Sequence, residues 1–417
     1  MLRARDLFFA LALSIVAAPT RAFAEPKATT APTAAALPTL RDLVGLARQR
    51  APEVTMGRAQ LEASRSSYAS ARMAPLQNPY LEIRAQRGAR GATQDVNVDG
   101  SLWLPLELSG QRQSRGREAA DFVQWHQALL EQSRAIATAR TVRAYGALVV
   151  GSRRFRVLTE LSGHTDAEAR YYAERLAMGD ATERDAAMSA VDAARHRMML
   201  SETQSDLLRA IGDLRELTGL SLEAQVAVDP QPSVFATGGH ATVRLNHSPQ
   251  LRALSAEAEY YASARERLRR DGLTPLSVGI LAGRGDFGET RLGAGLGYAF
   301  PVFRANQPER ARADAERVRA LQELSLRREL FARRADLLQL ELGELKKAFD
   351  IVTQDALPAA ERAVNAATET YRAGKGDLLS VLVSRRDFAA LSLRQLEILD
   401  KSWLLFSELV EITGELP

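Results

Sequence analysis

The sequence contains no cysteine in 417 residues, and this absence alone excludes several classes of function. The chain has no disulfide, no cysteine-ligated zinc site, no thiol nucleophile and no N-terminal cysteine that could carry a lipid. Aromatic residues make up only 6% of the chain, and charges of both signs are interspersed with a net charge of +4. No block of like charge indicates a nucleic-acid partner. What remains is rich in Ala, Leu, Arg and Glu, a composition that favours long helices.

Long apolar runs are also lacking, because no later stretch reaches the roughly 20 residues that a membrane-spanning helix needs. Residues 1–24 are expected to be a secretory signal, with an apolar segment at 7–18 and small residues at Ala22 and Ala24 before the cleavage point. Residues 25–38 are expected to form a flexible lead-in. Any insertion of the mature chain into a membrane must therefore use strands.

Motifs for catalysis or ligand binding have little support. Residues 283–288 read Gly-Arg-Gly-Asp-Phe-Gly, but a second strand is expected after them, not the helix that a dinucleotide site requires. Met198 and Met199 fall within a helical pattern and are interpreted as packing residues. None of the histidines has the spacing of a metal site: His126, His164, His196, His240 and His247. We therefore expect no enzyme activity, no cofactor and no bound metal.

The second half of the chain repeats the first at an offset near 195 residues. The segment Tyr68-Ala-Ser-Ala-Arg72 recurs letter for letter as Tyr261-Ala-Ser-Ala-Arg265. Further pairs keep the same order: Ala51-Pro-Glu53 with Ser248-Pro-Gln250, Pro105 with Pro301, Gly179-Asp180 with Gly376-Asp377, and Glu216-Leu-Thr-Gly219 with Glu411-Ile-Thr-Gly414. So many matches in register indicate an internal duplication. The first repeat is expected at 39–219, a linker at 220–240 and the second repeat at 241–417.

Each repeat is predicted to contain a helix, a β-hairpin, a very long helix, a breaker and a medium helix. The two shorter helices together nearly equal the length of the long one, so they can run end to end beside it. Two repeats then give a rod about four helices wide, with both hairpins at one end. Strands are expected at about 80–104 and 276–301.

The long helix of the second repeat shows a seven-residue apolar pattern typical of a coiled coil. One set of positions holds Leu324, Phe331, Leu338, Leu345, Val352, Ala359 and Ala366. The other holds Leu321, Arg328, Ala335, Leu342, Phe349, Ala356 and Ala363, with the arginine as its one exception. The apolar layers shrink from Leu and Phe to Ala along the helix. We expect neighbouring helices to approach most closely at the alanine end.

The four strand segments match the length of strands that cross an outer membrane at a tilt. In the second of them Val98 and Leu102 share one face while Asn97, Asp99 and Ser101 share the other. Four strands cannot close a barrel, and an open edge is not tolerated in lipid. Closure therefore needs other copies of the chain, in a number that this argument leaves open.

With these features the sequence resembles the TolC-like outer-membrane efflux proteins over essentially the whole mature chain. The resemblance rests on the duplication, on the strand end at 298–314 (Tyr-Ala-Phe-Pro-Val-Phe-Arg-Ala-Asn-Gln-Pro-Glu-Arg-Ala-Arg-Ala-Asp) and on the segment Tyr371-Arg-Ala-Gly-Lys-Gly-Asp-Leu-Leu-Ser-Val-Leu382. It implies a mainly α protein with a membrane β-barrel: a homotrimer with a 12-stranded barrel and a long periplasmic α-barrel. It also implies a passive channel in the outer membrane of a Gram-negative bacterium, docked to a periplasmic adaptor and an inner-membrane pump of the resistance–nodulation–division type.

Two sets of residues are candidates for function within this scheme. The helical tips Gly179, Asp180, Gly374, Lys375, Gly376 and Asp377 are expected to contact the adaptor. Asp350, Asp355 and Ala363 are candidates for a pore constriction. Export of metal ions, of small toxic compounds or of proteins by a type I system stays open. The alternative from another class is a periplasmic coiled-coil adaptor or structural protein.

Overall fold

The computed structural model describes residues 38–73, 78–90, 93–220, 234, 247–284, 289–302, 305–376 and 378–416. Residues 38–417 form one compact unit. The described elements follow in the order α1 (Leu40–Arg50), α2 (Pro52–Ala71), β1 (Tyr80–Arg90), β2 (Thr93–Leu106), α3 (Gln111–Ala177), α4 (Glu183–Thr218), α5 (Pro249–Asp271), β3 (Leu276–Arg284), β4 (Thr290–Gly297), α6 (Gln307–Ile351), the π-helical turn η3 (Val352–Ala356), α7 (Leu357–Arg372) and α8 (Leu378–Thr413).

Helix starts follow the local chemistry of the sequence. Thr39 and Asp42 form a reciprocal capping box at the start of α1, which satisfies two backbone N–H groups. Proline stands in the first turn of both α2 and α5, where its missing N–H costs nothing. The hydroxyl of Thr182 accepts a hydrogen bond from the Asp185 N–H and caps α4.

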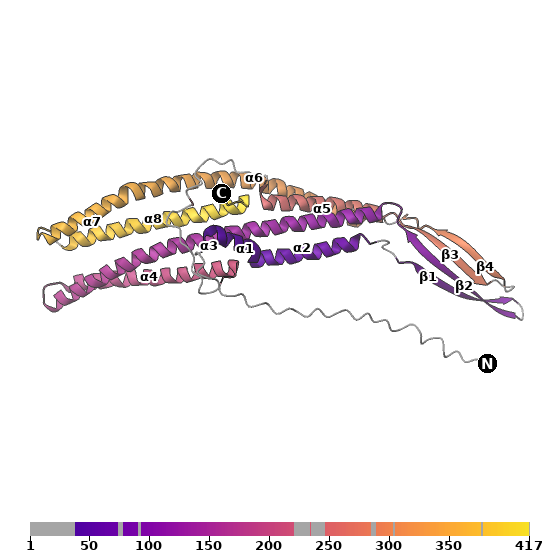
Figure 1. The fold of residues 1–417 in the computed structure, drawn as a ribbon, viewed down its shortest axis with the longest axis horizontal. Coiled ribbons are helices and arrows are strands. Elements are labelled where there is room, and N and C mark those ends of the chain that lie inside the picture. The colour runs from indigo at the N-terminus through magenta and orange to yellow at the C-terminus, as the bar shows by residue number, and fades with distance from the viewer. Residues whose placement is uncertain are drawn as a thin grey trace, which may run out of the picture. The chain divides into compact units, whose positions relative to one another are not determined.

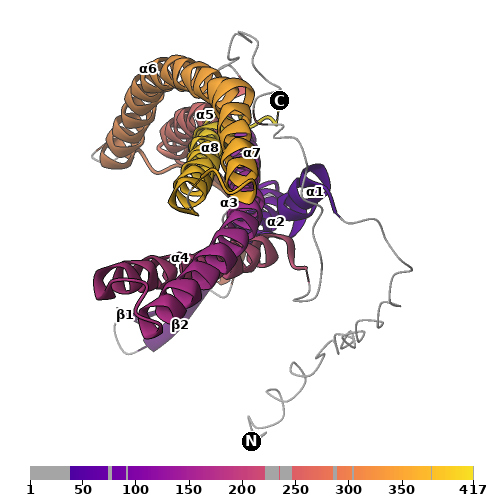
Figure 2. The same ribbon diagram turned by 90° about the vertical axis from the view of Figure 1, so that its left-hand side faces the viewer.

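The helices of each repeat run beside one long partner, as the lengths predicted. In the first repeat α2, of 20 residues, and α4, of 36 residues, both pack along α3, which has 67. In the second repeat α5 and α8 pack along the α6–η3–α7 helix. Seen end-on, the helices form a curved layer, with the strands at one end and the two helical tips at the other (Figures 1 and 2).

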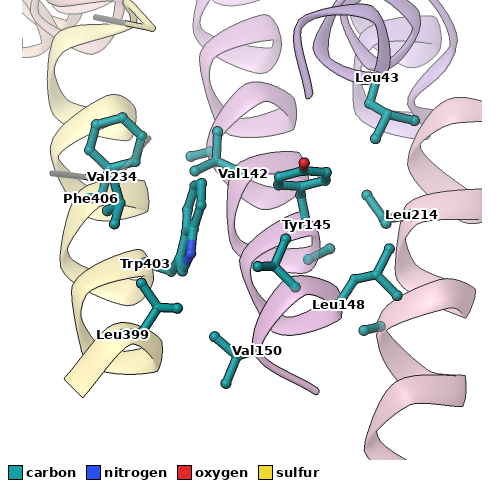
Figure 3. Packing of buried hydrophobic residues seen from close by; sticks show 14 of the residues in the cluster. Leu43, Val142, Tyr145, Leu148, Val150, Leu214, Val234, Leu399, Trp403 and Phe406 are labelled. Carbon is teal, nitrogen blue, oxygen red and sulfur yellow. The ribbon is translucent and has the colours of Figure 1, made fainter. Parts of the chain in front are cut away.

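The two repeats meet along α3, where the main core lies (Figure 3). Tyr145 of α3 and Trp403 of α8 are almost fully buried and pack edge to face, with ring centroids 5.8 Å apart. Gly146 lets the helices approach, since a Cβ there would lie 2.5 Å from Cγ of Trp403. Leu43 of α1 and Leu214 of α4 complete the cluster. The duplicated halves are thus joined by one contiguous core.

Two turns are repeated in detail and support the duplication. Gly110 and Asn306 both have positive φ, at 76° and 56°, immediately before the long helices. The side-chain oxygen of Gln111 accepts a hydrogen bond from the Ser109 N–H, and Gln307 does the same for Ala305. The medium helices end alike at Gly219 and Gly414, both with positive φ.

The strands form one antiparallel sheet in the order β1-β2-β3-β4. Two predicted boundaries are wrong. In the first hairpin, expected at about 80–104, the sequence predicts the turn at the four residues Gly88-Ala-Arg-Gly91, but Gly88 lies inside β1 and pairs with Asp95. The last strand ends at Gly297, and Tyr298 and Phe300 follow it as non-strand residues. The strand expected after residues 283–288 is confirmed, since β4 begins at Thr290. Residues 285–288 themselves lie outside the described residues.

The long helix of the second repeat is not continuous. At η3 the Leu357 N–H bonds to the carbonyl of Val352, five residues back, because Pro358 in the next position has no N–H and its ring obstructs regular helix. The seam predicted at Ala359, Ala363 and Ala366 is wrong for packing within the chain, since all three are exposed. The half-buried positions lie one residue later, at Ala360, Val364 and Ala367. The wide turn inserts one residue and shifts the register.

Several sequence predictions fall on undescribed residues. The signal at 1–24 and the lead-in at 25–38 lie outside the described residues apart from Pro38. The linker at 220–240 does so apart from Leu220 and Val234, and Val234 packs in the main core. The same is true of His240 and of Asp377 at the second tip.

Candidate functional site

The strand register divides the sheet into two chemically distinct faces. On one face of the sheet, every second residue of each strand is apolar, and we call this face the lipid face. Its residues are Leu81, Ile83, Ala85, Val98, Leu102, Leu104, Val278, Ile280, Ala282, Leu292, Ala294 and Leu296. Its larger side chains are exposed, with Leu292 at 80% and Leu296 at 75%. An apolar surface of this extent needs a partner or a lipid environment.

The opposite face of the sheet, here called the polar face, holds charged and small residues. Glu82 pairs with Arg84 at 2.7 Å, and Asp99 lies opposite Arg84 in the register. Glycines occupy every polar-face position of β4 after Arg291: Gly293, Gly295 and Gly297. Alternation of an apolar and a polar face along each strand is the pattern of a membrane barrel wall.

Trp103 is the polar-face residue that the sequence argument missed. It follows Asp99 and Ser101 at the same two-residue spacing. The alternation of side chains along a strand is therefore sufficient to place it on their face of the sheet. Its indole N–H donates a hydrogen bond of 2.9 Å to the hydroxyl of Ser101. The polar face thus carries a tryptophan in the same strand as Asp99 and Ser101.

The helical tips are two equivalent turns at the end of the helices remote from the strands (Figure 1). Gly179 and Gly374 both have positive φ, at 79° and 70°. The Asp180 N–H bonds to the carbonyl of Arg175, and the Lys375 N–H to that of Thr370, five residues back in each case. Gly374 thus corresponds to Gly179, which corrects the predicted pairing of Gly179 with Gly376.

The three candidate constriction residues occupy different environments on one helix. Asp350 is half-buried near the end of α6, Asp355 is exposed in η3 and Ala363 is exposed in α7. Asp355 is separated from Gly374 by about 28 Å of helix, at about 1.5 Å per residue. The fold does not bring these residues together with the tips within one chain.

Charged side chains connect the two helical hairpins between the core and the tips. Arg386 of α8 forms an ion pair with Asp192 of α4. Burial raises the pKa of the neighbouring Glu168 carboxyl, against the lowering effect of Arg386. Burial also lowers the pKa of the His196 imidazole. Sequence reasoning missed this set because its members come from three helices and share no short motif.

The residues that the structure describes hold neither a metal-ion cluster nor a membrane-spanning helix. No group of three or more His, Asp or Glu side chains in these ranges is arranged to hold a metal ion. Among the described helices, none combines the length and apolarity required to cross a membrane.

Comparisons with known proteins agree with this geometry. The cobalt-zinc-cadmium resistance protein CzcC of Cupriavidus metallidurans is 25% identical over 363 residues, which cover 85% of each chain. The Campylobacter jejuni outer-membrane channel CmeC superposes with a TM-score of 0.72 at 14% identity, over 90% of this chain and 85% of the other. The open state of the Neisseria gonorrhoeae outer-membrane channel MtrE gives 0.66 at 15% identity, over 90% and 89%. No family model matches the sequence.

The chain has the TolC-like outer-membrane channel fold. Both the mainly helical architecture and the four antiparallel strands agree with these structures.

Proposed function

We propose that the protein is the outer-membrane channel of a tripartite efflux system, a passive exit duct with no chemical step. The observation that carries this proposal is the four-stranded sheet, with one continuous apolar face and two unpaired edges, fused to long helices. An apolar strand face suits lipid, and the polar face suits a water-filled lumen. The strands lie in the outer membrane and the helices extend into the periplasm.

Closure by other copies of the chain follows from the unpaired edges of β1 and β4, and the likeness to TolC-like channels supports a homotrimer. Pairing β4 of one copy with β1 of the next removes both edges, and three copies give 12 strands. The outer helices α4 and α6 also expose apolar side chains that a neighbouring copy can cover: Met188, Val191, Met198, Leu208, Val318, Leu326, Leu330, Leu337 and Leu340. Exposed apolar residues on both sides of one curved layer favour lateral association.

The helical tips support a proposal for the partner proteins, and the name of a relative supports one for the cargo. Exposed turns that can contact a periplasmic adaptor are formed by Gly179 and Asp180 and by Gly374, Lys375 and Gly376. Asp377, which lies outside the described residues, is kept as a candidate, and the adaptor links the duct to a resistance–nodulation–division pump. The proposed cargo is metal ions or small toxic compounds. The name of CzcC supports metal ions among them, carried as substrate and not as a bound cofactor. Asp350, Asp355 and Ala363 remain the candidates for a constriction.

A matched pair of variants on β2 tests the membrane role. Leu102→Arg places a charge on the lipid face, at a cost of about 2–4 kcal/mol if the residue lies near the bilayer midplane. Ser101→Arg, one residue away, places the same charge on the polar face. We expect heat-modifiable trimers in the outer-membrane fraction for the wild type and Ser101→Arg, and a marked reduction for Leu102→Arg. Equal behaviour of both variants, or a soluble wild-type monomer, would contradict the proposal.

The cargo is tested by deleting the gene. We expect increased sensitivity to cobalt, zinc or cadmium, restored by the wild-type chain. Sensitivity to organic compounds alone would assign the duct to drug efflux, and loss of a secreted protein would assign it to type I secretion.

A further inference from the structure

A tryptophan lies flat on the polar face of the sheet, over a floor of glycines. The register places Tyr80, Trp103, Gly279 and Gly295 side by side across the four strands. A Cβ at Gly279 would lie 2.6 Å from the indole of Trp103, and one at Gly295 would lie 2.9 Å from it. The indole therefore covers bare backbone on β3 and β4, and side chains at these positions would displace it.

The indole extends into a small apolar surface. The Tyr80 ring is nearly parallel to it, with an interplanar angle of 15° and centroids 6.4 Å apart. Leu281, in the next register row, is 37% exposed on the same face. We call Tyr80, Trp103 and Leu281 the aromatic shelf. One face of its indole rests on the glycines, and the ring of Tyr80, which is 50% exposed, is stacked with the indole.

The shelf contrasts with the rest of the face on which it lies. The neighbouring rows hold Glu82, Arg84, Asp99, Ser101 and Arg291, which are suited to water. Glycine shielding by an aromatic ring stabilises a sheet, and that accounts for the packed side of the indole. It does not require a second ring held parallel beside the first or an exposed Leu281. A flat apolar surface in a polar wall is complementary to a flat apolar solute.

We propose that the aromatic shelf is a contact site for planar aromatic solutes that pass through the duct. Passage of the solutes through the duct rests on the proposed channel function. Binding to the shelf does not, because it can be measured without transport. The solute stacks on the exposed ring surface of the shelf, while the indole N–H of Trp103 stays bonded to Ser101. The site lies at the helix end of the sheet, because Tyr80 begins β1 and Trp103 lies near the end of β2. Every solute leaving the helices for the strands passes this level.

The probe is ethidium, a planar aromatic cation, with tetraethylammonium as a non-planar cation of the same charge. Binding of ethidium to the detergent-solubilised full chain is followed by fluorescence anisotropy. We expect Trp103→Ala to weaken binding about tenfold, which corresponds to about 1.4 kcal/mol, within the range of aromatic stacking. Trp103→Tyr should retain most of the affinity because it keeps a flat ring.

Leu102→Ala is the matched control, because Leu102 directly precedes Trp103 in β2 and lies on the lipid face. This variant should bind ethidium as the wild type does. Equal affinities of wild type and Trp103→Ala, or displacement of ethidium by equimolar tetraethylammonium, would overturn the proposal. Heat-modifiability of each variant verifies that it is folded, and Trp103→Tyr provides the test if Trp103→Ala is not.

Single-channel conductance in planar bilayers separates this proposal from the channel function. If the wild type conducts and ethidium shortens its open time equally in wild type and Trp103→Ala, the shelf is refuted and the channel stands. If ethidium binding depends on Trp103 but no conductance is found, the shelf stands and the channel function fails.

Discussion

The long helices of the two repeats occupy equivalent positions in the duplication, yet only α3 is a regular α-helix from end to end. The α3 helix contains buried residues from Gln111 to Thr165 and is packed by α1, α2, α4, α5 and α8. The α6 helix buries only Ala313, Ala320, Ala335 and Leu338, and α7 buries none. The helix with neighbours on both sides is uninterrupted, and the helix at the margin contains the π-helical turn.

The difference shows where the fold accepts an inserted residue. An extra residue in a helix rotates everything after it by about 100°. In α3 such a rotation would remove side chains from contacts on several sides at once. In α7 it moves the seam from Ala363 to Val364, against the single neighbour α8. The Gln395 side chain of α8 donates a hydrogen bond to the Thr353 hydroxyl and holds the wide turn in place.

The largest expected effect comes from adding a methyl group to each long helix. Gly146→Ala places a Cβ within 2.5 Å of the Trp403 side chain, so α3 and α8 must separate. We expect a loss of about 1–3 kcal/mol from overpacking. Gly343→Ala in α6 meets nothing within 4 Å and should gain about 0.5–1 kcal/mol through helix propensity. Thermal unfolding in detergent measures both, and destabilisation by Gly343→Ala would show that α6 is as crowded as α3.

The second prediction concerns the π-helical turn itself. Amides between Val352 and Pro358 should exchange hydrogen about tenfold faster than those of α3 near Leu158, a ratio close to the net worth of one hydrogen bond. Deleting Gln354 together with Pro358→Ala should restore regular helix and slow this exchange. Hydrogen exchange followed by mass spectrometry makes the measurement. Protection equal to that of α3 in the wild type would contradict the contrast between the helices.

The smallest effect is a pH dependence at the flank of α3. Burial raises the pKa of Glu168 above 4.5, so its stabilising protonated form is present at low pH and is lost as the pH rises through the folded-state pKa. Glu168→Gln stays neutral at every pH. We expect the variant to be more stable than the wild type at about pH 8, with the difference vanishing toward pH 4.5. A constant difference across this range would show that the ion pair network with Arg386 dominates instead.

Much of the fold could be predicted because the duplicated signals are local. Prolines at Pro52 and Pro249 start helices in any context, and glycines at Gly179 and Gly374 end them. The two faces of the sheet follow from alternation alone. The candidate site was harder to predict from the sequence. Trp103 was overlooked within a strand that was otherwise assigned correctly, and the Asp192–Arg386 pair joins residues 194 positions apart.

The sequence by itself determined the repeat, the order of its elements and the need for other copies, since these follow from spacing and from the cost of open strand edges in lipid. The tertiary structure decided which long helix is central and which apolar positions are covered. It also placed the indole of Trp103 over Gly279 and Gly295. Such contacts depend on the register between distant segments. A heptad pattern also does not show where one inserted residue will rotate the rest of the helix.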